Sequence, residues 1–288
     1  MKKAIYVNGG LGRITAALPA LKASNSLIIT SGWGELFTLT DLYCIESESA
    51  MMHSMLDGLD IITPEPYHQA GYRSGKYNMV KAFHKDLGTK GEDYGLTPDV
   101  KTSAVMYDKL VSSGAADKKI ITIQVRASGD LHNVRNMGKQ SVINAVDAAR
   151  ELGHFPVIIG DENIGFELDC SIVRSTTLTE FVSLIGLSDM FVGGDSSGMH
   201  IAKALNIPGI IYLTSTAGHK YYPEHFTEFR HPDHKSTFEY PRLFSAEQAQ
   251  SKKNDRAGVN RYDISKEEYL KTFESLGETN ASTSDGGS

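Results

Sequence analysis

The pattern of apolar and polar residues along the chain indicates strands and helices in regular alternation. Ala4–Val7 is a short apolar run that ends in a glycine-rich turn, after which Ile14, Leu18 and Leu21 recur at helical spacing. A second apolar run follows at Leu27–Thr30. A strand, a turn, a helix and another strand in this order predict the start of a parallel sheet.

The rest of the first half is less regular. Its pattern predicts helices over Leu36–Ile45, Ala50–Leu59, Tyr77–Leu87 and Lys101–Ser112, and a short strand over Asp60–Ile62.

The alternation begins again after Gly114. It predicts strands over Ile120–Val125, Phe155–Ile159, Met190–Val192 and Gly209–Leu213, helices over Lys139–Leu152 and Met199–Leu205, and a helix that begins with the capping box Thr177–Glu180. Two consecutive blocks that meet near residues 115–119 predict an α/β protein of two doubly wound, Rossmann-like domains facing a cleft.

These blocks give an expected domain organisation. We predict a first domain over residues 1–117 and a second over residues 118–262. The capping box Ser265–Glu268 heads a helix over residues 263–277, which can pack back on the first domain. The small, polar residues 278–288 are predicted to form a disordered tail.

Length and composition are those of a globular protein. The 288 residues are 40% hydrophobic, and no apolar run approaches the length of about 18 residues that predicts a membrane span. The two cysteines, Cys44 and Cys170, lie too far apart in sequence for a metal motif, which favours a reducing, cytoplasmic compartment. A net charge of −6 weighs against a nucleic-acid-binding protein, although a local basic cleft is compatible with it.

The segment Phe191–Leu205 contains the strongest candidate site. It places Asp195, Ser196, Ser197 and Gly198 between a strand and a helix, where ligands bind in open α/β sheets. Small residues let backbone N–H groups approach a ligand, and a helix N-terminus favours an anion. We therefore predict a phosphate site to which His200 also donates. The structural alternative is that Asp195 and the two serines only cap the helix.

The stretch Thr179–Thr214 resembles the signature of the ADP-heptose heptosyltransferases. In that family a helix, a short strand, an Asp-Ser-Gly-x-x-His-like loop and an Ala-x-Ala-Leu helix follow in this order. Here the glycine comes one place later, but Asp195 and His200 keep the family spacing. The segment Gly10–Leu21 also resembles the family's opening, a glycine turn followed by Leu-Pro-Ala-Leu. The resemblance implies a GT-B glycosyltransferase whose donor site includes Gly10 and Gly12.

A dinucleotide-binding enzyme is a rival interpretation of the first glycine turn. The third glycine or alanine of that fingerprint falls on Thr15, however, and no acidic residue ends the strand Leu27–Thr30. Both departures weigh against a nicotinamide or flavin enzyme.

Arg13 departs from the heptosyltransferase pattern. The family has an acidic residue there, proposed as general base, and an arginine cannot deprotonate a hydroxyl at neutral pH. Arg13 could instead bind a donor phosphate or an acidic acceptor. Glu35 is our first substitute for the base, followed by Glu65 and Asp41. An ordinary solvated carboxylate remains the alternative for Glu35.

A further arginine follows the strand Ile120–Val125. The run Ile121–Asp130 resembles the His-x-Arg-Arg-x-Asp phosphate-binding strand of fucosyltransferases, which implies that Arg126 clamps a diphosphate. By the same resemblance Arg135 lies near the donor-side lysine of the heptosyltransferases. Asp161 and Glu162 could contact the nucleoside. A surface arginine and solvated loop carboxylates are the alternatives.

The first half carries a candidate acceptor site. Pro64–Lys76 interleaves aromatic and basic residues, and its predicted acceptor-binding members are Tyr67, His68, Tyr72, Arg73 and Lys76. A packed surface loop is the alternative. The histidines His219, His225, His231 and His234 lack the spacing of a zinc site. No cofactor or metal is expected, since the resemblance implies a metal-independent reaction.

These observations predict transfer of a sugar from a nucleotide-diphosphate sugar to an acceptor hydroxyl, with inversion at the anomeric carbon. The resemblance implies a surface glycan as acceptor. Two alternatives stay open. One is a bacteriophage-type enzyme that modifies a hydroxymethylated base in DNA, which needs a basic stripe such as Arg73, Lys76, Lys81 and Lys85. The other is a nucleotide-sugar-binding module without catalysis, which the loss of the acidic residue at Arg13 would permit.

Overall fold

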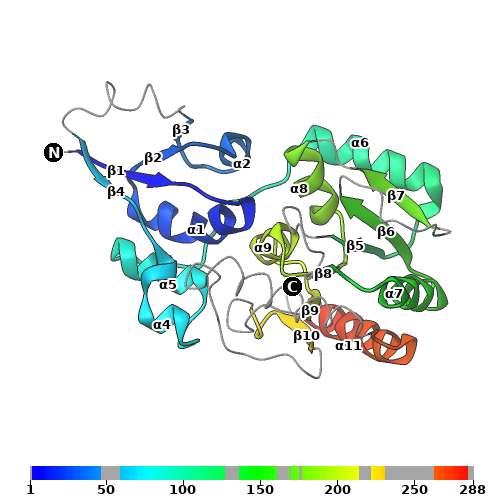
Figure 1. The fold of residues 1–288 in the computed structure, drawn as a ribbon. Coiled ribbons are helices and arrows are strands. Elements are labelled where there is room, and N and C mark those ends of the chain that lie inside the picture. Colours follow the sequence, from blue (N-terminus) through cyan, green and yellow to red (C-terminus); the bar gives the residue numbers. More distant parts are fainter. Residues whose placement is uncertain are drawn as a thin grey trace, which may run out of the picture.

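Two parallel β-sheets organise the chain (Figure 1). The computed structural model describes residues 2–46, 59–126, 136–160, 168, 170–174, 177–213, 222–230 and 263–284. The first sheet has the order β3-β2-β1-β4, with every neighbouring pair parallel. Its strands are β1 (Lys2–Val7), β2 (Leu27–Thr30), β3 (Cys44–Glu46) and β4 (Leu59–Ile62).

Helices pack on the first sheet through the apolar faces that their spacing predicts. Ile14, Leu18 and Leu21 of α1 are almost completely buried, and α1 lies against α5. The side chain of Asn78 caps α5 by accepting a hydrogen bond from the backbone N–H of Lys81. The helical elements are α1 (Leu11–Ser24), α2 (Gly34–Thr38), η1 (Pro66–His68), α4 (Ala70–Arg73) and α5 (Met79–Leu87).

The second sheet has the order β10-β9-β8-β5-β6-β7, again with every pair parallel. Its central strands are buried along their whole length without alternation, because helices cover both faces of a parallel sheet. The strands are β5 (Ile120–Gln124), β6 (Phe155–Gly160), β7 (Ser171–Arg174), β8 (Met190–Gly194), β9 (Gly209–Leu213) and β10 (Phe226–Arg230).

The helices around the second sheet are α6 (Val100–Leu110), which continues into a π turn η2 (Val111–Ala115), α7 (Lys139–Glu151), α8 (Leu178–Gly186), α9 (Ser197–Ala204) and α11 (Lys266–Ser284). The capping box at the start of α8 is confirmed: the Thr177 side chain accepts from the Glu180 backbone, and the Glu180 carboxylate accepts from the Thr177 backbone. The predicted fold of two Rossmann-like domains is confirmed.

Several predicted elements need correction. The helix expected over Leu36–Ile45 is the short α2 followed by strand β3, because Cys44–Glu46 pairs with β2 at the sheet edge. The strands β7 and β10 were not predicted. Both are edge strands of the second sheet, and a short edge strand has a weak local pattern. Most of the helix predicted over Ala50–Leu59 lies outside the described residues.

The domain boundaries stay a prediction, but two helices pack away from their expected places. Helix α6, expected in the first domain, packs against α8 beside the second sheet. Helix α11, which could have returned to the first domain, instead packs on α7, where Tyr269 and Phe273 share a core with Val142 and Met190. Its apolar stripe covers a face of the second sheet that would otherwise meet water. The helix continues to Ser284, past the start of the predicted tail.

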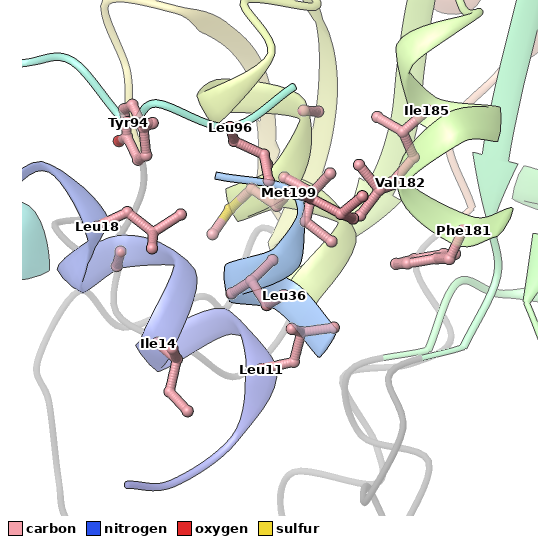
Figure 2. Close-up of a cluster of buried hydrophobic side chains, with 14 of the residues drawn as sticks. Leu11, Ile14, Leu18, Leu36, Tyr94, Leu96, Phe181, Val182, Ile185 and Met199 are labelled. Carbon is pink, nitrogen blue, oxygen red and sulfur yellow. The ribbon is translucent and has the colours of Figure 1, made fainter. Parts of the chain in front are cut away.

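The two domains meet through one continuous apolar cluster (Figure 2). Leu11, Ile14, Leu18 and Leu36 come from the first domain, Tyr94 and Leu96 from the connecting segment (residues 88–99, between α5 and α6), and Phe181, Val182, Ile185 and Met199 from the second. Apolar contact of this extent favours a defined arrangement of the domains over free relative motion.

The connecting segment is also held to the first domain by charge. Lys22 at the end of α1 pairs with both Asp41 and Asp93, at 2.7 Å each. Asp41, one of the candidate bases, is therefore engaged at the end of α1 that lies away from the glycine turn. Within the part of the chain that the structure describes, no helix is both long and apolar enough to span a bilayer.

Candidate functional site

The loop between β8 and α9 carries the predicted phosphate site. Asp195 follows the last residue of β8, and Ser196 is the N-cap residue of α9. The Ser196 side chain does not cap the helix: its hydroxyl donates to Oε1 of Gln124, the last residue of the adjacent strand β5. The interpretation of Ser196 as a plain helix cap is therefore wrong, because its hydroxyl joins the loop to the sheet.

Gly198 lies next to the side chain of Gln124 at the start of α9. A Cβ atom at residue 198 would lie 2.2 Å from the Gln124 Oε1 atom and 3.0 Å from the Phe191 ring. Only glycine leaves room for the hydrogen bond between Ser196 and Gln124. This close approach gives a physical reason for the glycine at 198, one place later than in the heptosyltransferase motif.

His200 stands in the first turn of α9, and its residue is only 6% exposed. Its Nδ1 atom lies 2.8 Å from the hydroxyl of Tyr222, and the two rings meet edge to face. The other edge of the imidazole faces the first domain. A Cβ at Gly12 would lie 2.7 Å from Cδ2 and 3.4 Å from Nε2 of His200.

The glycine turn of the first domain thus meets the start of α9. Gly10 is the N-cap residue of α1, and a Cβ there would have no neighbour within 4 Å. Gly12, in the first turn of α1, would also place a Cβ 3.4 Å from the Cα of Ser197. The sequence predicted both glycines as donor-binding residues, and the structure brings Gly12 into direct contact with two members of the predicted phosphate site.

Arg126 lies two residues beyond the end of β5 and is half-buried. Gln124 of β5 is paired with Gly193 of the neighbouring strand β8. Arg126 comes two residues after Gln124, and Asp195 comes two residues after Gly193. Both therefore emerge from the same edge of the sheet. The other donor-side candidates, Arg135, Asp161 and Glu162, lie outside the described residues.

Glu35 joins the two domains. Its Oε1 atom accepts hydrogen bonds from both the backbone N–H and the hydroxyl of Thr179, at 2.9 and 2.7 Å. Thr179 is in the first turn of α8, whose N-terminal N–H groups attract a carboxylate. The simple interpretation of Glu35 as a solvated carboxylate is therefore incomplete, since one of its oxygens is already engaged.

The side chain of Arg13 packs against other residues of the first domain. Its Nη2 atom donates to the carbonyl of Pro64 and pairs with Oε2 of Glu65 at 3.2 Å, while the guanidinium lies over the ring of Tyr67. The side chain is 14% exposed. Arg13 thus fastens the start of the predicted acceptor loop to α1, and it places the carboxylate of Glu65 beside the glycine turn.

The predicted acceptor residues separate into two groups. Tyr67 and Tyr72 pack edge to face, and Tyr72 is completely buried, so its ring belongs to the core and not to a contact surface. His68, Arg73 and Lys76 are exposed. Burial of Tyr72 is a correction to its predicted role in direct acceptor binding, and the reason is that α4 turns this side chain inward.

A basic groove runs along α5. Its charged lining consists of Lys76, Lys81, Lys85 and Lys90, with Glu92 as the acidic member. Tyr77 and Val80 give it an aromatic and apolar part, and the Lys85 ammonium lies over the Tyr77 ring. Three of the four residues of the expected basic stripe occur here. Among the described residues, none of these lysines forms an ion pair with a carboxylate.

No group of three or more histidine, cysteine or acidic side chains is placed to hold a metal ion within the described ranges. Three functional candidates were missed from the sequence: Gln124, Thr179 and Tyr222. Gln124 is a polar residue at the end of a buried strand, and such a residue in the sequence indicates a candidate functional position. Thr179 and Tyr222 have no such signal, because their partners are distant in the sequence.

Comparisons with known proteins bear on this site directly. Residues 162–225 match the model of glycosyltransferase family 9 (heptosyltransferase), a range that includes Asp195, His200 and Tyr222. A comparison with curated proteins finds no match. The chain is similar in structure to a family 9 glycosyl transferase from Veillonella parvula DSM 2008, with a TM-score of 0.70, 12% identity and 96% of each chain covered.

Two heptosyltransferases from E. coli are also similar. ADP-heptose lps heptosyltransferase II has a TM-score of 0.68 and 13% identity, with 98% of this chain and 100% of that chain covered. The dodecameric iron-containing heptosyltransferase TibC, in complex with ADP-D-beta-D-heptose, has a TM-score of 0.65 and 11% identity, with 96% and 76% covered. These structures confirm the GT-B fold. The family match confirms the predicted resemblance and supports a glycosyltransferase enzyme.

Proposed function

We propose that this chain transfers a sugar from a nucleoside-diphosphate sugar to an acceptor hydroxyl. One observation carries the proposal. The start of α9, which is not capped by its N-cap serine, lies against Gly12 of the first domain within the segment that matches the heptosyltransferase family. A helix N-terminus in an open α/β sheet suits a phosphate group, and the boundary between two such domains suits a reaction between two substrates.

In this proposal the diphosphate binds at the start of α9. Backbone N–H groups of Ser197 and Gly198 and the hydroxyl of Ser197 donate to its oxygens, while His200 and Arg126 add side-chain donors. Arg126 follows β5 at the same sheet edge as Asp195, which supports its part in this set. Asp195 is assigned to the nucleoside side of the donor, because a carboxylate beside a diphosphate would repel it.

The transfer is a single displacement. The acceptor oxygen attacks the anomeric carbon, the bond from that carbon to the diphosphate oxygen breaks, and the nucleoside diphosphate leaves with the bonding electrons. The proton of the acceptor hydroxyl passes to a base. One displacement inverts the anomeric carbon, and the donors around the diphosphate stabilise the negative charge that develops on it.

Glu35 stays our first candidate for the base, and Glu65 the second. The position of Glu35 between the domains supports this role. Both hydrogen bonds from Thr179 go to its Oε1 atom, and neither goes to Oε2. Glu65 supports it by its place beside the glycine turn, although its Oε2 atom is already paired with Arg13 at 3.2 Å. Variants that separate the two are given in the Discussion.

The reaction is proposed to need no bound metal, because the helix N-terminus and Arg126 supply the positive charge that the leaving diphosphate requires. Transfer should therefore continue in excess EDTA. Loss of activity with EDTA, and its return with added Mg²⁺, would contradict this part of the proposal.

We propose an acceptor that carries negative charge. The basic groove along α5 supports this, since its lysines lack carboxylate partners among the described residues although the chain as a whole has a charge of −6. We place an acidic glycan before DNA, because the net charge of −6 weighs against a nucleic-acid-binding protein. The Lys81→Gln, Lys85→Gln variant should raise KM for an acidic oligosaccharide and leave KM for the donor unchanged. Preferential use of hydroxymethylated DNA would favour the other candidate.

The first experiment is a thermal-shift screen with UDP-, GDP-, ADP- and CMP-sugars. An ADP-sugar is the first donor to test, because TibC was solved with ADP-D-beta-D-heptose. Binding should be lost in an Arg126→Ala, Asp195→Ala double variant that still melts cooperatively. Unchanged binding in that variant would exclude the proposed donor site. Donor binding without transfer to any acceptor would favour the non-catalytic module.

A further inference from the structure

A buried chain of three aromatic side chains ends at the candidate phosphate site. His200 Nδ1 lies 2.8 Å from the Tyr222 hydroxyl, and the side chain of Tyr94 neighbours Tyr222 in turn. Tyr222 is 1% exposed and Tyr94 is 7% exposed. Tyr94 belongs to the segment that connects the two domains, and Tyr222 precedes β10. Three separate parts of the chain therefore converge on one imidazole.

Burial keeps both phenols protonated. Removal from water raises the pKa of Tyr94 and of Tyr222 above the usual value for tyrosine, and the neighbouring Tyr94 and Tyr72 raise the pKa of Tyr222 further. Glu224 has the same direction of effect on both. Lys203 lies over the Tyr222 ring at 5.9 Å. Each hydroxyl thus has one proton to donate and lone pairs with which to accept.

Two hydrogen-bond directions satisfy this chain. In the first, the Tyr222 hydroxyl donates to Nδ1, so the imidazole proton is on Nε2. In the second, Nδ1–H donates to the Tyr222 hydroxyl, so Nε2 carries a lone pair. The Nε2 edge faces Gly12 and the start of α9. Only the first direction presents a donor where a helix N-terminus favours an anion.

We propose that Tyr222, supported by Tyr94, is a positioning residue that holds His200 as the Nε2–H tautomer, with that N–H directed at the diphosphate of the donor. This rests on the proposed function for its ligand. Neither tyrosine touches the substrate. Their effect is transmitted through the imidazole, much as an outer hydrogen-bond partner fixes the tautomer of a metal-binding histidine. Because Tyr94 is in the connecting segment, the device also links the domain arrangement to the donor site.

The test measures the tautomer directly. Two-bond ¹H–¹⁵N correlation spectra of the labelled, full-length chain without ligand should give the Nε2–H pattern for His200, assigned by its absence in His200→Gln. Tyr222→Phe keeps the ring and removes the hydroxyl, so this signal should shift or show exchange between tautomers. An Nδ1–H tautomer in the wild type, or an unchanged signal in Tyr222→Phe, would overturn the proposal.

Nucleotide binding provides the second measurement, with ADP as the probe. Tyr222→Phe should weaken ADP binding about tenfold, as expected for one lost hydrogen bond, and Tyr94→Phe about threefold. Tyr269→Phe is a matched control. Its ring is equally buried in the same domain, and its hydroxyl makes no hydrogen bond within the described residues. It should leave both spectrum and affinity unchanged. Equal losses in all three variants would mean a general packing effect and overturn the positioning role.

The two measurements separate this inference from the proposed function. If the wild type binds no nucleotide, the proposed function fails, but the tautomer of His200 and its response to Tyr222→Phe still decide the hydrogen-bond direction. If nucleotides bind and the tautomer does not depend on Tyr222, only the positioning role fails.

Discussion

Gly12 of α1 and His200 of α9 are in such close contact that a methyl group on residue 12 would overlap the imidazole, with 2.7 Å between its Cβ and Cδ2. The contact joins the glycine turn of one domain to the candidate phosphate loop of the other. The contact leaves no room for a side chain at residue 12. The two domains can therefore approach this closely only if residue 12 is glycine.

Gly12→Ala should therefore lower stability and donor affinity together. The overlap forces either His200 or the α1–α9 contact to move, at a cost of about 1–3 kcal/mol for overpacking. Thermal melting and ADP binding measure the two effects. Gly10→Ala is the matched control for thermal stability, because a Cβ there meets no atom within 4 Å and its φ of −73° suits alanine. A Gly12→Ala protein that behaves like Gly10→Ala would contradict the close contact.

Glu35 can act as a base, as a link between domains, or as both, and two substitutions separate these roles. Glu35→Gln retains an oxygen that accepts from Thr179, so its stability should stay near that of the wild type. Transfer should fall by about 10²–10⁴-fold if Glu35 is the base. Glu35→Ala loses both hydrogen bonds and should also be less stable, by about 1 kcal/mol.

Full activity of Glu35→Gln would remove Glu35 as the base and leave it as a link to α8. The same substitution at Glu65 then becomes the decisive one. Single-turnover rates at saturating donor measure both variants, since they report the chemical step apart from product release.

Arg13→Ala should loosen the start of the acceptor loop. The guanidinium is mostly buried and holds Pro64, Glu65 and Tyr67, so its loss should cost about 1–2 kcal/mol of stability. We expect a raised KM for the acceptor and an unchanged KM for the donor, because these contacts all lie within the first domain. A raised donor KM instead would indicate that Arg13 binds the donor phosphate, as the sequence left open.

Gly198→Ala should disrupt the candidate phosphate loop without touching the first domain. The new methyl group would displace Gln124, whose Oε1 atom lies 2.2 Å from the Cβ position, and so break its hydrogen bond with Ser196. Donor affinity should fall by about tenfold or more. The double variant Gln124→Ala, Gly198→Ala should lose less donor-binding free energy than the sum of the losses in the two single variants. Strict additivity would mean that the two residues do not interact.

Local pattern determined much of the architecture. The runs Leu27–Thr30 and Gly209–Leu213 form strands with the predicted bounds, and the capping box at Thr177 begins a helix as expected. These features depend on residues a few positions apart, which is why periodicity and capping chemistry reveal them. The loop Asp195–His200 was identified for the same reason: a strand, small residues and a helix follow one another directly in the sequence.

Tertiary structure decided which side chains meet. Gln124 reaches Ser196, Glu35 reaches Thr179, and Tyr222 reaches His200 only after strands and helices far apart in sequence have packed. Tertiary packing also placed α6 against α8 and α11 against α7, because a helix packs where its apolar face is best covered. The sequence by itself therefore located the loop Asp195–His200 between a strand and a helix, and its role as a phosphate site stays a prediction. Packing decided that Gly12, Gln124 and Tyr222 shape it, because contacts between distant segments depend on three-dimensional fit and leave no local pattern.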